Sequence, residues 1–176
     1  MNPGGTTTRQ KTRSSVSAMG KFSRAEIGQA VRNYTTVVEG CSASGDWRPF
    51  ADLFTEDVVY TEHHYGVFHG REAVRDWIVA VMAPFPHMRF PSDWIAYDDD
   101  NDAVVIMIKN LLDHPTDPQG EPFWFPNWTR LVYAGDGLFS SEEDIYNPNR
   151  DAPRVVAAWM QAGGRLASNE ILQPNA

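Results

Sequence analysis

Residues 57–82 read DVVYTEHHYGVFHGREAVRDWIVAVM, and this stretch decides the fold. An apolar strand at 58–62 ends on one carboxylate, Glu62, and the chain then turns through Gly70 directly into an amphipathic helix. Pro84 and Pro86 end that helix, because proline cannot continue its hydrogen bonding. The apolar face of the helix comprises Val74, Trp77, Ile78, Val81 and Met82. A carboxylate at the end of an apolar strand is a candidate site residue.

A second helix is expected upstream, where Ser23 and Glu26 have the spacing of a capping box. Its apolar stripe places Tyr34 on the buried face, together with Ile27, Ala30, Val31 and Val38. A short helix is expected after Asp46, with an inward face made of Trp47, Phe50, Leu53 and Phe54.

Downstream, the pattern changes to extended segments separated by turns, at 87–97, 103–112, 122–133 and 138–146. A last helix is expected from Asp151 to the Gly163-Gly164 pair. The whole order predicts an α+β fold. We expect a strongly curved, mainly antiparallel sheet wrapped around three main helices, with a cone-shaped apolar cavity open at one end.

The chain has 176 residues, of which 42% are hydrophobic, and this predicts one globular domain at 22–164. Residues 1–21 are rich in Thr, Ser, Gly and basic side chains and are too polar to join a core. We expect 1–21 to be a disordered tail and 165–176 to be a second tail at the C-terminal end.

Charge and composition restrict the partners. The net charge of −8 and pI near 5.0 argue against a nucleic-acid partner, because a phosphate backbone would be repelled. No apolar run approaches the roughly 20 residues of a membrane span. Cys41 is the single cysteine, so no disulfide forms within the chain. These features predict a cytoplasmic protein without a membrane partner.

The segments Phe54-Thr55-Glu56-Asp57 and His69-Gly70-Arg71-Glu72, in this order of elements, resemble the nuclear transport factor 2-like superfamily. The resemblance is to its branch of SnoaL-like, ketosteroid isomerase-like and scytalone dehydratase-like proteins, and it runs from about Ser23 to Gly164. It implies the α+β fold described above and a cavity that takes a small hydrophobic molecule.

The resemblance implies catalytic roles for two residues. Tyr34 matches the tyrosine that stabilises an oxyanion in ketosteroid isomerases, and Glu62 falls where those enzymes hold the aspartate that moves a proton. A partly desolvated carboxylate has a raised pKa, as a general base requires. The alternatives are a core tyrosine whose hydroxyl bonds to the backbone and a solvated carboxylate at a strand end.

A third catalytic candidate is His87, which looks like the histidine of scytalone dehydratase and related lyases. With Tyr34 it could remove a proton beside a carbonyl and release water; alternatively, it lies in a solvated loop after Pro86. One departure argues against strict steroid isomerisation. The second oxyanion donor of ketosteroid isomerases, a buried aspartic acid, is replaced by Thr129, whose hydroxyl is a poorer donor.

The remaining candidates are expected to line the cavity and bind substrate. They are Trp77, Asn110, Phe123, Phe125, Asn127, Thr129 and Asp144. The register of 142–147 stays open, which leaves Asp144 as a possible pocket acid. Epoxide hydrolysis needs an Asp-Arg-Asp set, and no inward-facing set of that kind is apparent. The histidines lack the spacing of a metal site, so no metal is expected.

Together these features predict a cofactor-free enzyme that uses acid-base chemistry on a hydrophobic ketone related to polyketides or steroids. The reaction would be an isomerisation, a cyclisation or a dehydration. The alternative is a protein that binds a hydrophobic ligand in the same cavity without turnover, since one fold hosts many functions.

A homodimer is also expected. The segment 122–133 is apolar on both faces, with Trp124 and Trp128 on one and Phe125 and Leu131 on the other. The helices of one chain can cover only one side of a sheet, so a second copy is expected to cover the other.

Overall fold

The computed structural model describes residues 20–169 and 172–173. Six strands form one sheet in the order β2-β1-β6-β5-β4-β3. All neighbouring strands are antiparallel except β1 and β6, which are parallel. The strands are β1 (Phe54–Glu62), β2 (Gly66–His69), β3 (Ser92–Asp98), β4 (Ala103–Leu112), β5 (Phe123–Gly135) and β6 (Leu138–Ile145).

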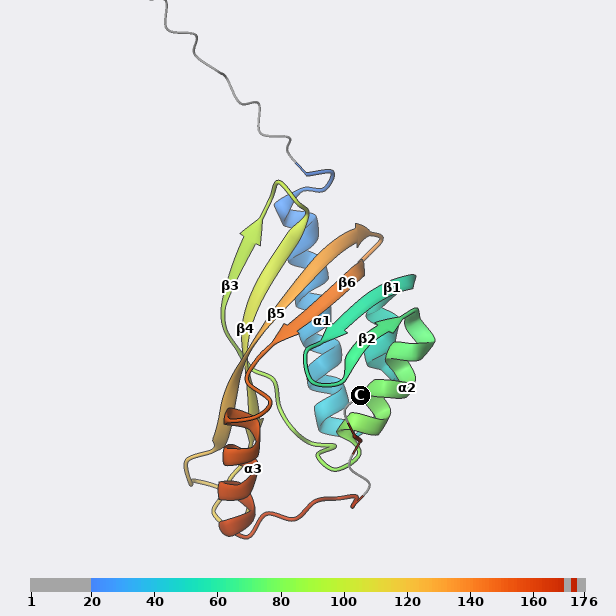
Figure 1. Cartoon of the computed structure of the whole chain (residues 1–176). Helices are drawn as coiled ribbons and strands as arrows, with labels where there is room; N and C mark the ends of the chain where they lie inside the picture. The colour runs from blue at the N-terminus through green and yellow to red at the C-terminus, as the bar shows by residue number, and fades with distance from the viewer. Residues whose placement is uncertain (1–19, 170–171, 174–176) are drawn as a thin grey trace, which may run out of the picture.

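Four helical segments accompany the sheet. They are α1 (Arg24–Ser44), the 3₁₀ helix η1 (Arg48–Leu53), α2 (Arg71–Met82) and α3 (Asp151–Gln161). In Figure 1, α1 crosses behind the curved sheet, α2 lies beside β1 and β2, and α3 lies at the lower ends of β4 and β5. The predicted α+β architecture is therefore confirmed. None of the helices in the described ranges is long and apolar enough to cross a membrane.

The predicted start of α1 is confirmed. Ser23 is the N-cap, and its Oγ accepts the backbone N–H of Glu26 at 3.2 Å. The Glu26 carboxylate accepts a hydrogen bond from the Tyr133 hydroxyl at 3.1 Å, which ties the helix start to β5. Gly45 ends the helix with a φ of 76°, a left-handed conformation that glycine adopts without strain. The apolar stripe is buried as expected, with Tyr34 within it.

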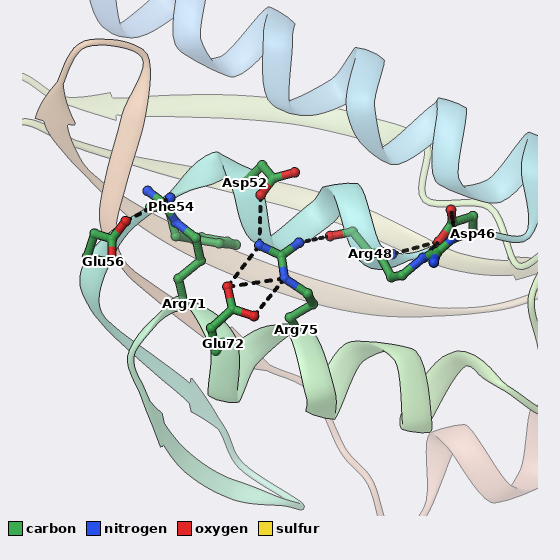
Figure 2. A network of polar contacts seen from close by, with 8 residues as sticks. All are labelled: Asp46, Arg48, Asp52, Phe54, Glu56, Arg71, Glu72 and Arg75. Atoms are coloured by element: carbon green, nitrogen blue, oxygen red, sulfur yellow. Dashed lines mark hydrogen bonds and ion pairs between the residues drawn. The ribbon is translucent and has the colours of Figure 1, made fainter.

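An arginine cluster holds η1 against α2 (Figure 2). Arg75 on α2 donates hydrogen bonds to Asp52, to Glu72 and to the carbonyl of Arg48. One turn earlier, Arg71 donates from Nε to the carbonyl of Phe54 at 2.8 Å. These contacts fix η1, whose Phe50 contributes to the cavity wall.

Two extended segments differ from expectation. Residues 66–69, expected in the turn before α2, form the edge strand β2, which pairs with β1 from Val59↔His69 to Glu62↔Gly66. The segment expected at 87–97 becomes regular only at Ser92, because Pro86 and Pro91 lack the N–H that a strand ladder needs. His87 therefore lies in a connection and not on a strand.

Both ends of the described chain are attached to the domain. The backbone N–H groups of Lys21 and Phe22 donate to Asp102, in the turn between β3 and β4. Ala167 donates to the carbonyl of Pro84, and Leu172 packs against the core. Residues 1–19 of the expected N-terminal tail lie outside the described residues.

Candidate active site

A cavity of about 550 Å³ lies between the inner face of the sheet, η1, α2 and α3. Its wall is mainly apolar, with contributions from Phe50, Trp77, Ile108, Phe125 and Val156. The polar residues in the wall are Tyr60, Glu62, His64, Tyr65, Asn110, Asn127, Glu142, Asp144 and Tyr146. Cavities of this size and character are typical of small-molecule sites.

Strand register brings the acidic residues of the wall together. Glu142 and Asp144 are two residues apart on β6, so both point to the inner face. The parallel pairing of β1 and β6 places Tyr60 beside Glu142 and Glu62 beside Asp144. On the other side of β6, Thr129 of β5 pairs with Asp144.

Asp144 is the best-supported carboxylate of this group. Its Oδ1 accepts hydrogen bonds from Asn127 Nδ2 at 2.8 Å and from Thr129 Oγ1 at 2.6 Å. Its Oδ2 lies 2.6 Å from the Tyr60 hydroxyl. Three donors therefore stabilise a negative charge on Asp144.

Glu142 is more deeply buried, with 2% of its surface exposed against 8% for Asp144. Its Oε1 lies 3.0 Å from the Tyr34 hydroxyl and 3.1 Å from the Tyr60 hydroxyl. Its Oε2 finds no hydrogen-bond partner among the described residues.

Glu142 and Asp144 are linked through one hydroxyl group. Tyr60 carries a single hydroxyl hydrogen and lies within hydrogen-bond distance of both carboxyl groups, 2.6 Å from Asp144 and 3.1 Å from Glu142. With the Tyr60 hydrogen on the shorter contact, to Asp144, a proton on Glu142 would complete the longer one. Burial, followed by repulsion from Asp144, raises the pKa of Glu142 well above its ordinary value. Burial also raises the pKa of Asp144, but bonds from Thr129, Tyr60 and Asn127 oppose this. These opposing contributions favour the proton on Glu142 and the negative charge on Asp144.

Glu62 also lines the cavity, and it is buried, with 3% exposed. Its Oε2 accepts the backbone N–H groups of His64 at 2.7 Å and Tyr65 at 2.6 Å, and so it holds the turn between β1 and β2. The pKa of the Tyr146 hydroxyl is raised, first because Tyr146 is buried and second because of its hydrogen bond to Glu62. The alternative of a solvated strand end is thus wrong.

A family model for the SnoaL-like domain matches residues 31–141 of this chain, which is more than half of its length. The chain belongs to the SnoaL-like family. The resemblance inferred from the sequence is confirmed. No curated protein matches the chain.

Solved structures share the fold of this SnoaL-like chain. A nuclear transport factor 2-like protein from Anabaena variabilis is 15% identical, with a TM-score of 0.59 over 75% of this chain and 98% of its own. A protein from Jannaschia assigned as a SnoaL-like polyketide cyclase is 19% identical, with a TM-score of 0.54 over 81% and 96%. A protein from Catenulispora acidiphila with a ketosteroid isomerase-like fold, in complex with trimethylamine, is 20% identical, with a TM-score of 0.56 over 70% and 92%.

Five of the residues expected to bind substrate line the cavity of this SnoaL-like domain: Trp77, Asn110, Phe125, Asn127 and Asp144. Two do not. Thr129 is fully buried behind Asp144, to which it donates its hydrogen bond. Phe123 is the first residue of β5, and its ring packs against His114.

Two of the three catalytic candidates lie outside the cavity wall. Tyr34 is buried, and its hydroxyl bonds to Glu142, so it contacts the acid pair from behind. His87 is exposed, and its Nδ1 lies 2.8 Å from the carbonyl oxygen of Ser42. It lines a surface depression that is separate from the cavity. The proline-rich connection, and not the end of α2, determines this position.

Sequence reasoning missed Tyr60 and Glu142. Both could have been found from alternation, since Tyr60 shares a face with Glu62 and Glu142 shares one with Asp144. The pairing of β1 with β6 was not available from any local pattern. Within the described residues, no group of three or more His, Cys, Asp or Glu side chains has a geometry suited to a metal ion.

Proposed function

We propose that this SnoaL-like protein is an enzyme that moves a proton on a hydrophobic ketone, with Asp144 as the base. The observation that carries this proposal is the Glu142–Asp144 pair, which shares the Tyr60 hydroxyl and faces an apolar cavity of about 550 Å³. Pairs of carboxyl groups in different protonation states are the usual equipment of acid-base enzymes.

In the first step, Asp144 removes a proton from the carbon beside the substrate carbonyl. The C–H bond breaks, and its electron pair moves toward the carbonyl oxygen to give an enolate. Neutral Glu142 behind Asp144 keeps the pair at one negative charge, and Tyr60 holds Asp144 through its hydroxyl. The low dielectric of the apolar wall strengthens these interactions.

The second step determines the reaction type. Return of the proton from Asp144 to another carbon isomerises the substrate. Attack of the enolate carbon on a second carbonyl forms a C–C bond, and Asp144 then protonates the new alkoxide, which completes a cyclisation. Transfer of the proton to a leaving hydroxyl releases water. All three outcomes use the same base, and the resemblance of the fold to a protein assigned as a polyketide cyclase favours cyclisation.

The test measures proton exchange, which needs no knowledge of the final product. The protein is incubated in D₂O with tetralone, anthrone and androstenedione, and deuterium uptake beside the carbonyl is followed by mass spectrometry. We expect catalysed exchange with at least one ketone. Asp144→Asn is expected to lower the exchange rate at least about 100-fold while ligand affinity is kept.

Glu62→Gln is the matched control, because it changes a second cavity carboxylate at nearly constant shape. We expect it to retain most of the exchange, since Glu62 lies outside the Glu142–Asp144 pair that shares the Tyr60 hydroxyl. Loss of exchange in Glu62→Gln with full activity in Asp144→Asn would return the role of base to Glu62. Binding of the ketones without exchange would establish the alternative, a ligand-binding protein without turnover.

A further inference from the structure

We propose that Asn110 binds a second oxygen atom of the ligand, far from the acid pair. The substrate class that follows is an extended apolar molecule with oxygen functions at two separate positions. This inference rests on the proposed function only in taking the Glu142–Asp144 pair as the site of the first oxygen function.

Asn110 interrupts an apolar column on the inner face of β4. The residues at the same face are Val104, Ile106, Ile108 and Leu112, all buried. Asn110 is 9% exposed and lines the cavity. A polar side chain in such a wall is costly unless something bonds to it.

The Asn110 amide nitrogen is buried and finds no hydrogen-bond partner among the described residues. Asn127, its diagonal neighbour on β5, also has one buried atom without a partner, its Oδ1, but its Nδ2 donates to Asp144 at 2.8 Å. The structure thus gives a folding role to Asn127 and none to Asn110. Rotation of the Asn110 amide presents either the NH₂ group or the carbonyl oxygen to the cavity, and so it can bind a carbonyl or a hydroxyl.

The register sets the distance between the two recognition points. Asn110 pairs with Phe125, Asn127 pairs with Ile108, and Asp144 pairs with Thr129. Asn110 is therefore two diagonal steps across the sheet from Asp144, which corresponds to about 15 Å between backbone positions. The side chains shorten this separation inside the cavity, since Asn127 and Asp144, which are one diagonal step apart, approach to 2.8 Å.

A ligand that bonds to Asn110 while its other oxygen function lies at Asp144 must extend from β4 across β5 to β6, which suits a molecule of several fused or linked rings. The cavity of about 550 Å³ has room for such a molecule. Asn110 would then orient the ligand so that the carbon beside its distant carbonyl lies at Asp144.

The first experiment measures the stability of the free protein in two matched variants. Asn110→Leu removes an amide without a partner, so we expect Tm to rise by about 2–4 °C. Asn127→Leu makes the same substitution on the same face but removes a bonded amide, so we expect Tm to fall. A fall in both variants would show that Asn110 has a folding role, and it would overturn the inference.

The second experiment measures affinity for matched pairs of probes by tryptophan fluorescence. The first pair is androstenedione and the androstenone that lacks the second carbonyl. The second pair is a dihydroxyanthraquinone that carries one hydroxyl at each end and its monohydroxy analogue. We expect wild-type protein to bind the member with the additional oxygen function about tenfold more tightly in at least one pair. In Asn110→Leu this preference is expected to disappear, with the affinity for the member that lacks this oxygen retained.

Equal affinities within each pair, no binding to any probe, or an unchanged preference in Asn110→Leu would each overturn the inference. Binding is read without turnover, so the result is independent of the exchange test. A preference that depends on Asn110 without any exchange would refute only the proposed catalysis. Exchange that depends on Asp144 without such a preference would refute only the role of Asn110.

Discussion

Glu142 and Asp144 meet at one hydroxyl group, that of Tyr60, which lies 3.1 Å from the first carboxyl and 2.6 Å from the second. The shorter contact places the Tyr60 hydrogen on Asp144, and a proton on Glu142 would complete the longer contact. Burial, followed by repulsion from Asp144, raises the pKa of Glu142 and so favours that proton. This relationship makes the site responsive to pH and to small changes in its hydrogen bonds.

Stability should depend on pH through Glu142. Its pKa is raised in the folded state above the ordinary 4.5, so the folded protein keeps this proton where the unfolded chain has lost it. The free energy of unfolding should therefore decrease as pH rises above 4.5, by at most about 1.4 kcal/mol per pH unit for this group. Glu142→Gln should lack this contribution. Urea unfolding of both proteins between about pH 5 and pH 8 measures it, and parallel pH dependences would contradict the protonation of Glu142.

Tyr60→Phe should impair proton transfer more than binding. The change removes the hydroxyl that connects the two carboxyl groups, and we expect ketone exchange to slow by about 100-fold. Tyr34→Phe is the control, because Tyr34 bonds to Glu142 but not to Asp144. In Tyr34→Phe we expect ketone exchange to slow by less than about tenfold. A larger effect of Tyr34→Phe would indicate that Glu142, and not Asp144, carries the chemistry.

Arg75→Gln should destabilise the protein. Only 21% of the Arg75 side chain is exposed, and it joins α2 to η1 through Asp52, Glu72 and the carbonyl of Arg48. After allowing for solvent screening, we expect a loss of about 1 kcal/mol. Arg150→Gln, at a pair where the arginine is 74% exposed, should leave stability nearly unchanged. Chemical denaturation of both variants measures this, and equal effects would show that the cluster contributes nothing specific.

The protein should form a twofold dimer through the outer face of the sheet. Trp94, Trp124, Trp128 and Ile145 are exposed there, between 42% and 50% of their surface. Light scattering after size exclusion should give about twice the chain mass of 19.8 kDa at micromolar concentration. Trp128→Glu should produce monomers, because it places a charge in the apolar patch. A monomeric wild-type protein would show that this face stays open to solvent.

Local patterns in the sequence were sufficient for the helices and most strands. Ser23 and Gly45 mark the ends of α1 through capping, which depends only on neighbouring residues. The predicted strand at 103–112 coincides with β4, because its alternation of side chains continues without a break. The edge strand β2 was missed because four residues are too few to show a period. The match of the family model confirms the SnoaL-like assignment made from the landmarks around β1 and α2.

The sequence by itself thus determined the helices, most of the strands, the curved sheet and the family, because these follow from spacing within short segments. Only the tertiary structure decided the site. The parallel pairing of β1 with β6 joins residues more than 80 positions apart and brings Tyr60 to Glu142. The same packing removes Glu142 from water, and this burial raises its pKa and sets its protonation. It also occupies Glu62 with the β1–β2 turn and leaves His87 outside the cavity. Burial and the pairing of distant strands are properties of the assembled chain, and no local period encodes them.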